Sequence, residues 1–407
     1  MRDVDVAVIG AGQAGLATSY HLTQRGIEHV VLDRGRVAES WRTRRWESFV
    51  LNGPNWAFVL PGYEYDGPDP DDFMARDEIV SRFSDYARRI AAPVEENVDV
   101  VTVQRDDVSD RYLLDTSAGP IRARSVVAAT GAYQRRNRPR NGLDPSIRQL
   151  NTDEFRSAAG LLDGGVLIVG SGQSGCQVAE DLREGGRDVW LATGNCGWIP
   201  RRYRGKDNVR WRLEMGIFDQ TVAELGHAFR LVCPPMQTGV GTVRDINMRT
   251  LNAAGVRLTG RFRDADGFTV RLGDDLQSNA SRSDEAAIRF RAGVDDYVRE
   301  GRIDAPVETD FEPTSALPDA PTELDLRALG INNVIWATGF RLDFSWIDLD
   351  LETVDGYPAQ TQGVSRHPGL YFMGLQLMHT RKSGLIFGVG EDAAHVSSAI
   401  AYQLGVS

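Results

Sequence analysis

The chain has 407 residues, a formal net charge of −11, and an ordinary globular composition with 42% hydrophobic and 25% charged residues. This length allows two or three domains with cores of their own. The acidic balance argues against nucleic acid or an anionic membrane as a partner, and no apolar run approaches the length of a membrane span. The N-terminus carries acidic residues and enters the first predicted strand at once, which argues against a secretory leader and favours the cytoplasm.

The cysteines and histidines suggest neither a redox centre nor a metal site. Cys176, Cys196 and Cys233 are odd in number and include no Cys-x-x-Cys. We therefore expect no disulfide framework and no redox-active dithiol. The six histidines show no spacing typical of metal ligands, so we expect no metal.

The first predicted element is a buried strand over 4–9 that runs into a glycine-rich turn and a helix. A second buried strand follows over 27–32. Strand, glycine turn, helix and strand in this order form a dinucleotide-binding fingerprint, in which the backbone approaches a pyrophosphate and the helix N-terminus attracts it. An acid after the second strand is placed to hold ribose hydroxyls. The predicted contacts are Gly10, Gly12, Gln13, Ala14, Gly15 and Asp33.

Residues 34–56 contain three tryptophans separated by Gly, Pro and Asn, which fits neither a helix nor an alternating strand. Two interpretations stay open. The segment is an irregular loop pinned by aromatic rings, or it faces a planar cofactor. In the second case the cofactor contacts are Arg34, Ser40, Trp41 and Arg42.

The chain continues with an amphipathic helix from Asp77 and with predicted strands over 98–103, 111–116 and 121–128 that form a small insert. The last strand ends in Ala-Thr-Gly, which adds Thr130 and Gly131 to the predicted contacts. A linker over 135–153, rich in Arg, Asn, Pro and Gly, follows.

The fingerprint then occurs a second time, after a strand over 166–169 and before a helix and a strand over 188–191. Its turn consists of Gly170, Ser171, Gly172, Gln173, Ser174 and Gly175. Two nucleotide sites in one chain indicate two cofactors and a path for electrons between them.

The second unit has no acid after its second strand, and a basic run follows that includes Arg201, Arg202 and Arg204. This combination suits a ribose 2′-phosphate, which guanidinium pairs and a carboxylate repels. The alternative is a solvated basic loop. We therefore predict FAD at the first site and NADPH at the second.

Residues 207–305 carry no fingerprint and elaborate the second unit, where a substrate pocket could lie. Their pattern predicts a helix over 211–229, a strand over 255–261 and a helix over 284–298. A strand over 333–336 then ends in Ala337, Thr338 and Gly339, which suits a second crossing between nucleotide domains. After a short strand over 369–374, the segment 383–392 opens a closing helix, where Gly384 permits close approach of a flavin or merely close packing of helix and strand.

These motifs resemble the class B flavin-dependent monooxygenases, which comprise flavin-containing monooxygenases and Baeyer–Villiger enzymes, and in particular their bacterial flavoprotein branch. The resemblance lies in the two glycine turns and in four further segments, and only residues 210–320 match weakly. The further segments are 40–42, 51–56, 335–340 and 384–392.

The resemblance implies an α/β fold with two Rossmann-like dinucleotide-binding domains. We expect residues 1–155 and 325–407 to form the FAD-binding domain and residues 156–324 to form an inserted NADPH-binding domain. In such enzymes NADPH reduces FAD, NADP⁺ stays bound, and O₂ forms a C4a-peroxyflavin that oxygenates N, S or a carbonyl carbon. An Asn near the flavin supports this intermediate. Asn52 matches its position, with Asn55 as the alternative register.

One departure concerns the family's linker signature, Phe-x-Gly-x-x-x-His-x-x-x-Tyr/Phe/Trp, which falls on residues 145–155. Only Phe155 is kept, while Pro145, Ile147 and Asn151 replace the Phe, Gly and His. This weakens the case for ordinary oxygenase kinetics, because the linker couples the NADPH site to the flavin. The signature does not end in the Trp of Baeyer–Villiger enzymes, which favours N- or S-oxygenation slightly.

The expected partners are a small-molecule substrate and O₂, and the oligomeric state is left open between a monomer and a homodimer. The main alternative function is an FAD-dependent NADPH reductase that passes electrons to an acceptor without oxygenation. A redox sensor that binds both nucleotides without catalysis is the third possibility.

Overall fold

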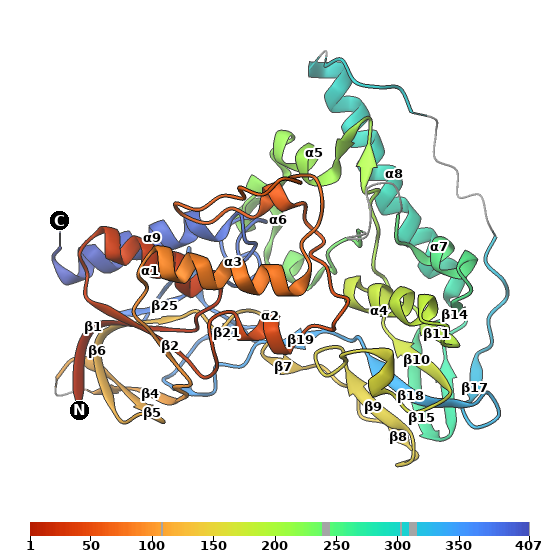
Figure 1. Ribbon diagram of the computed structural model, residues 1–407, viewed down its shortest axis with the longest axis horizontal. Helices are drawn as coiled ribbons and strands as arrows, with labels where there is room; N and C mark the ends of the chain where they lie inside the picture. Colours follow the sequence, from red (N-terminus) through yellow and green to blue (C-terminus); the bar gives the residue numbers. More distant parts are fainter. Residues whose placement is uncertain (107–108, 238–244, 302, 309–315, 407) are drawn as a thin grey trace.

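The computed structural model describes residues 1–106, 109–237, 245–301, 303–308 and 316–406, and it contains two large sheets in two units of the chain (Figure 1). The first sheet has a parallel part with the order β3-β2-β1-β6-β25. Its strands are β1 (Arg2–Ile9), β2 (His29–Asp33), β3 (Val94–Glu96), β6 (Ile121–Ala128) and β25 (Leu370–Phe372).

The remaining strands extend this sheet at its edges. The antiparallel pair β4 (Val100–Asp106) and β5 (Arg111–Thr116) joins the first half of β6. The prediction that 121–128 belongs to a small insert is wrong, because β6 lies next to β1 over its whole length. The short edge strands are β20 (Ile347–Asp348), β23 (Gln360–Thr361) and β24 (Val364–Ser365).

Helices cover the first sheet because each buries one apolar face. Helix α1 (Gln13–Gln24) packs against α9 (Val389–Leu404), and α3 (Arg76–Arg89) lies beside α1 (Figure 1). The short helix α2 (Glu39–Thr43) contacts α3.

The second sheet is parallel throughout, with the order β14-β11-β10-β18-β9. Its strands are β9 (Arg148–Asn151), β10 (Gly165–Val169), β11 (Val189–Ala192), β14 (Arg257–Thr259) and β18 (Ile331–Trp336). Helices α4 (Gln173–Glu184) and α7 (Met248–Ala253) pack on it, and a small sheet adjoins it, formed by β8 (Gly142–Leu143), β15 (Phe262–Gly267), β16 (Thr269–Leu272) and β17 (Glu323–Asp325).

Strands β9 and β18 come from stretches that the sequence analysis placed in the FAD-binding domain. The second sheet therefore extends beyond the predicted boundaries at 155 and 325. The two connections between the units run side by side, since β7 (Arg135–Arg136) pairs with β19 (Phe340–Arg341) in antiparallel register. The division into an FAD-binding and an inserted NADPH-binding domain stays a prediction.

The elaboration of the second unit contains several short elements and the long helix α8 (Leu276–Gly301), which starts before the predicted residue 284. The predicted single helix over 211–229 is wrong, because Gly216 and Gly226 adopt φ values of 66° and 80° that interrupt it. The pieces are β12 (Arg202–Tyr203), β13 (Lys206–Asp207), α5 (Asn208–Glu214), η3 (Ile217–Asp219), α6 (Val222–Leu225) and η4 (His227–Leu231). Among the described residues, no helix combines the length and apolarity needed to cross a bilayer.

Candidate functional site

The first glycine turn lies where β1, β2 and β6 end together, since Ile9 pairs with both Leu32 and Ala128. Gly10 has φ +113°, and a Cβ there would lie 2.5 Å from the carbonyl oxygen of Ala129. A Cβ on Gly15 would lie 1.8 Å from Gly10 O, so this glycine lets α1 pack on the strand. A Cβ on Gly12 would meet no described atom within 4 Å, so the turn is open on the side where a pyrophosphate would approach.

The N-terminus of α1 and Asp33 complete this cradle. Gly12 is the N-cap and supplies no side chain, so the first N–H groups of the helix are left for a ligand. Asp33 Oδ2 accepts from the N–H of Ala11 at 2.7 Å, and Oδ1 accepts from Gly35 N at 2.8 Å. These bonds fix the carboxylate at the strand end and leave lone pairs for ribose hydroxyls. The residues present therefore fit an adenine dinucleotide such as FAD.

The segment after Asp33 lies against the same turn. Ala38 N donates to Ala11 O at 3.2 Å, and Trp41 stacks on Phe83 with ring centres 6.3 Å apart. The predicted contacts Arg34 and Ser40 are exposed, and Arg42 lies 4.0 Å from Glu39. Across the turn, Thr130 Oγ1 accepts from Gln134 Nε2 at 2.8 Å, and Gly131 adopts φ +76°. The structure thus gathers these segments, and their contacts with FAD stay predictions.

The two candidate asparagines differ in how their side chains are engaged. Asn55 is buried, and its Nδ2 donates to Asp69 O at 2.9 Å, so it holds the acidic loop in place. Asn52 is half-buried, and its carbonyl oxygen accepts from Arg201 Nη1 of the second unit at 2.8 Å. Among the described residues the Asn52 side chain forms no hydrogen bond, so its amide is available where the two units meet. Its catalytic role stays a prediction.

The C-terminal segment closes the first site. Gln13 Nε2 donates to Gly384 O at 2.7 Å, which ties this segment to the start of α1. Asp392, in the first turn of α9, is buried, and burial raises its pKa to about 6. The sequence marks Asp392 only as an acid near a glycine-rich helix start, which is too weak a signal to predict a functional residue.

The second glycine turn repeats the geometry of the first. Gly170 has φ +109°, with a hypothetical Cβ 2.6 Å from Ala337 O, and a Cβ on Gly175 would lie 1.9 Å from Gly170 O. Ser171 Oγ accepts from Gly194 N at 2.9 Å, while Ser174 is exposed. Gly172 is the N-cap of α4 and again supplies no side chain. This cradle also fits a dinucleotide.

Residues 232–237, which we call the strap, lie across this second turn. Gln173 Nε2 donates to Gln237 O at 2.8 Å, and Gln237 N donates to Gln173 Oε1 at 3.0 Å. Cys233 Sγ lies 3.5 Å from the position of a Cβ on Gly172. On its other side the strap is bonded to the chain after β11, since Met236 N donates to Gly197 O at 2.8 Å.

The expectation of no disulfide is wrong, because Cys196 and Cys233 are paired, with Cα atoms 5.5 Å apart. The bond joins the strap to the chain after β11. Sequence spacing could not reveal it, because 37 residues separate the two cysteines. Cys176 is buried and free, and burial raises the pKa of its thiol.

The three arginines predicted for the 2′-phosphate do not converge. Arg201 is buried, pairs with Asp207 at 2.6 Å and reaches Asn52 O. Arg202 donates to Gly205 O at 2.9 Å, and Arg204 pairs with Asp295. Their role in coenzyme binding stays a prediction.

Another arginine, which the sequence analysis missed, lies at the strand ends of the second sheet. Arg261 follows β14, the neighbour of β11, and its guanidinium donates to Asn195 Oδ1. Nothing in its local sequence distinguishes it, because its position depends on the order of the strands.

The two connections between the units pass near the second turn. Thr338 Oγ1 donates to Asn137 O at 2.6 Å, and Asn137 Nδ2 donates to Thr338 O at 3.1 Å. Together with the Gly170–Ala337 approach, these bonds fix Ala337, Thr338 and Gly339 beside the turn. Asn151, in the place of the linker His, donates through its N and Nδ2 to Glu154 Oε2, both at 2.9 Å.

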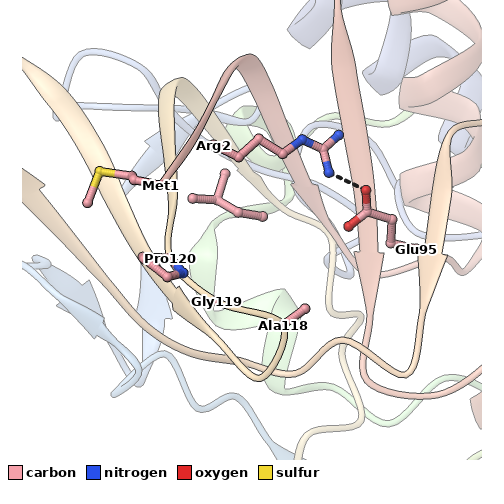
Figure 2. Close-up of a pocket in the computed structure, with 7 residues that line it drawn as sticks. Met1, Arg2, Glu95, Ala118, Gly119 and Pro120 are labelled. Carbon is pink, nitrogen blue, oxygen red and sulfur yellow. Dashed lines mark hydrogen bonds and ion pairs between the residues drawn. The ribbon is translucent and has the colours of Figure 1, made fainter.

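A surface hollow near the N-terminus carries no comparable chemistry. Figure 2 shows it between Met1, Arg2, Glu95 and the turn 118–120, with Arg2 paired to Glu95. It lies at the amino end of β1, opposite the end that leads into the glycine turn. Among the described residues, no group of three or more His, Cys, Asp or Glu side chains is placed to hold a metal.

Comparison with known proteins places the chain in a family. Residues 7–220 match the family model described as pyridine nucleotide-disulphide oxidoreductase. The chain is 30% identical over 403 residues to an uncharacterized CzcO-like oxidoreductase of Geobacillus kaustophilus, with 98% of both chains covered. It is 23% identical to the probable indole-3-pyruvate monooxygenase YUCCA3 of Arabidopsis thaliana, with 97% of this chain and 86% of that protein covered.

A solved structure shows the same fold. A flavin-containing monooxygenase from Stenotrophomonas maltophilia superimposes with a TM-score of 0.68 at 20% identity, covering 99% of this chain and 100% of that one. The predicted α/β fold of the flavoprotein monooxygenase type is confirmed by this likeness, and the resemblance inferred from the motifs is confirmed with it.

Proposed function

The chain belongs to the pyridine nucleotide-disulphide oxidoreductase family, and we propose that it is an FAD- and NADPH-dependent monooxygenase that transfers one oxygen atom of O₂ to N or S of a small organic substrate. The supporting observation is the position of Asn52. Its loop belongs to the first nucleotide unit, yet its carbonyl is held by Arg201 of the second. A primary amide at this boundary can donate and accept hydrogen bonds without adding a charge.

The first glycine turn, the N-terminus of α1 and Asp33 would hold FAD, and the second turn with the N-terminus of α4 would hold NADPH. The flavin, once reduced by NADPH, supplies the activation of O₂. The chain's part is to orient the two cofactors, to exclude water, and to hold hydrogen-bonding groups at their meeting point.

NADPH preference has two candidate arginine sets. The sequence favours Arg201, Arg202 and Arg204. The strand order favours Arg261 beside the acid-free end of β11. A bidentate guanidinium–phosphate pair at either place would distinguish NADPH from NADH.

The paired cysteines do not support a dithiol reductase. Cys233 lies against Gly172, in the turn assigned to NADPH, and not in the turn assigned to FAD. A disulfide that takes electrons from a flavin must reach the flavin ring, whereas this pair lies beside the turn that would hold the coenzyme phosphates.

The experiment is rapid mixing. The FAD-loaded protein is reduced anaerobically with NADPH and mixed with O₂ while flavin absorbance is followed. A species that is neither reduced nor oxidised flavin should accumulate and decay faster with an N- or S-containing acceptor. Direct return to oxidised flavin, with or without acceptors, would show a reductase or oxidase instead.

A further inference from the structure

Two arginines, one in the elaboration of the second unit and one in the C-terminal segment, have no carboxylate partner among the described residues. Arg212, on α5, is half-buried, and its Cζ lies 4.2 Å from the centre of the Phe218 ring. In the part of the chain that the structure describes, its guanidinium forms no hydrogen bond or ion pair. Arg381 comes from the C-terminal segment, and its Nη1 donates to Gln220 Oε1 at 2.9 Å. Cations in such surroundings normally have an acidic partner.

The acids of this region are already engaged elsewhere. Asp207 Oδ1 accepts from Arg201 Nη2 at 2.6 Å and from Val209 N at 2.7 Å, so it caps α5 and holds Arg201. Asp219 and Glu391 both bind Lys382, at 2.6 and 2.7 Å. The region therefore keeps positive charge in excess.

Apolar rings surround this charge. Phe218 and Phe387 meet edge to face with ring centres 5.0 Å apart, and Phe218 is buried with Val209 and Ala57 in one small cluster. The residues come from three distant parts of the chain: the loop after Asn52, α5 with η3, and the C-terminal segment.

The C-terminal segment is docked on the elaboration by backbone bonds. Arg381 N donates to Gln220 O at 3.0 Å, and Val222 N donates to His379 O at 2.8 Å. The arginines thus lie between the Asn52 loop, which Arg201 holds, and the segment that Gln13 ties to the first nucleotide site.

We propose that Arg212 and Arg381 bind the carboxylate of the substrate, and that the substrate is an apolar organic acid whose body packs on the half-buried ring of Phe387. A planar guanidinium matches a carboxylate in two hydrogen bonds, and the ring accommodates an aryl or alkyl group. The inference rests on the proposed function, since it assigns the substrate of that site. It goes beyond it by specifying a charged recognition group.

The electrostatics of Arg212 agree with this assignment. Burial, together with the nearby Arg381 and Arg201, lowers the pKa of Arg212 to about 9. The charged form of Arg212 is therefore destabilised in the folded chain, and a bound anion would stabilise it.

The test measures binding, not turnover. The FAD-loaded protein is titrated by calorimetry with indole-3-acetate and with its neutral amide, indole-3-acetamide, which has nearly the same shape. The acid should bind about ten- to a hundredfold more tightly than the amide, as expected for a charge-assisted pair. Arg212→Gln and Arg381→Gln should each remove most of this difference, and Arg212→Lys should restore part of it.

Arg210→Gln is the matched control, because Arg210 lies on the same helix, is exposed, and has its Cζ 4.0 Å from the Trp56 ring centre. It should keep the preference for the acid. Equal binding of acid and amide, or no binding of either at millimolar concentration, would overturn the inference. Since neither titration involves O₂ or NADPH, acid binding together with direct return to oxidised flavin in the rapid-mixing experiment would refute the proposed function and leave the anion site standing.

Discussion

At the scale of single residues, Arg261 makes the coenzyme assignment testable. Arg261→Gln should weaken NADPH binding about ten- to a hundredfold and leave NADH binding nearly unchanged, because only NADPH carries the phosphate that this guanidinium would pair. Dissociation constants of both coenzymes, measured by titration, give the answer. The double variant Arg202→Gln/Arg204→Gln is the comparison, and loss of NADPH affinity there, with none in Arg261→Gln, would favour the basic loop instead.

The buried carboxyl of Asp392 predicts that the free energy of unfolding depends on pH. Burial raises the pKa of its carboxyl from 3.8 to about 6, and its Oδ2 has no hydrogen-bond partner among the described residues. Between about pH 4 and 6 the folded state binds a proton that the unfolded state does not. The unfolding free energy therefore falls as pH rises through this window, and the full penalty is present above it.

Asp392→Asn should accordingly stabilise the protein at pH 8 by up to about 3 kcal/mol, with the gain vanishing near pH 4. Urea unfolding at several pH values measures it. A gain independent of pH, or a loss at pH 8, would contradict the assigned cause.

The role of a residue could be predicted from the sequence only where its position is fixed by elements adjacent in the chain. The glycines of both turns and Asp33 are fixed by strand–turn–helix continuity, so their places were predictable. Arg212, Arg381 and Arg261 act through neighbours far along the chain. Their environment is decided by strand order and docking, which spacing does not encode.

At the scale of elements, the buried strands before each glycine turn were predictable from short apolar runs, whereas the elaboration was not. Aromatic residues over 211–229 suggest one helix, but Gly216 and Gly226 divide it. Strand β9 lies in a linker too polar to suggest a sheet strand. Its strand conformation depends on parallel pairing with β18 at the edge of the second sheet.

The strap is the element whose attachment can be changed by reduction. Its disulfide closes a loop across 37 residues, and the loss of this constraint should cost about 2–4 kcal/mol of unfolding free energy. Dithiothreitol should lower the thermal midpoint of the wild type. Cys233→Ser should melt at the lower midpoint with or without reductant. A wild type whose midpoint ignores the reductant would show that the bond contributes nothing to stability.

At the scale of the whole molecule, Arg201 is a residue whose role depends on both nucleotide units. Arg201 is held by Asp207 in the second unit and holds Asn52 O in the first. The motifs predict each unit but place Arg201 at the coenzyme, because only the assembled fold shows that Arg201 bridges the units. Asn52 is therefore positioned by a contact between the units.

Asn52→Ala should leave anaerobic flavin reduction by NADPH within about twofold of the wild type, because Arg201 bonds the backbone carbonyl, which the substitution keeps. The reaction with O₂ should change instead. Asn52→Ala removes the group that would donate and accept hydrogen bonds beside the flavin, so turnover should release hydrogen peroxide in near-equal amounts to the NADPH consumed. Stopped-flow absorbance measures the rate of flavin reduction, and a peroxide assay measures the yield of hydrogen peroxide.

Asn55→Ala tests which of the two asparagines, Asn52 or Asn55, has the catalytic role. Asn55 holds the acidic loop through Asp69, so its loss should lower stability without a specific rise in peroxide. Peroxide release from Asn55→Ala alone would move the catalytic role to that residue. Arg201→Ala, which frees the Asn52 carbonyl without removing the amide, should fall between wild type and Asn52→Ala in peroxide yield, because the amide remains but its position is no longer fixed from the second unit.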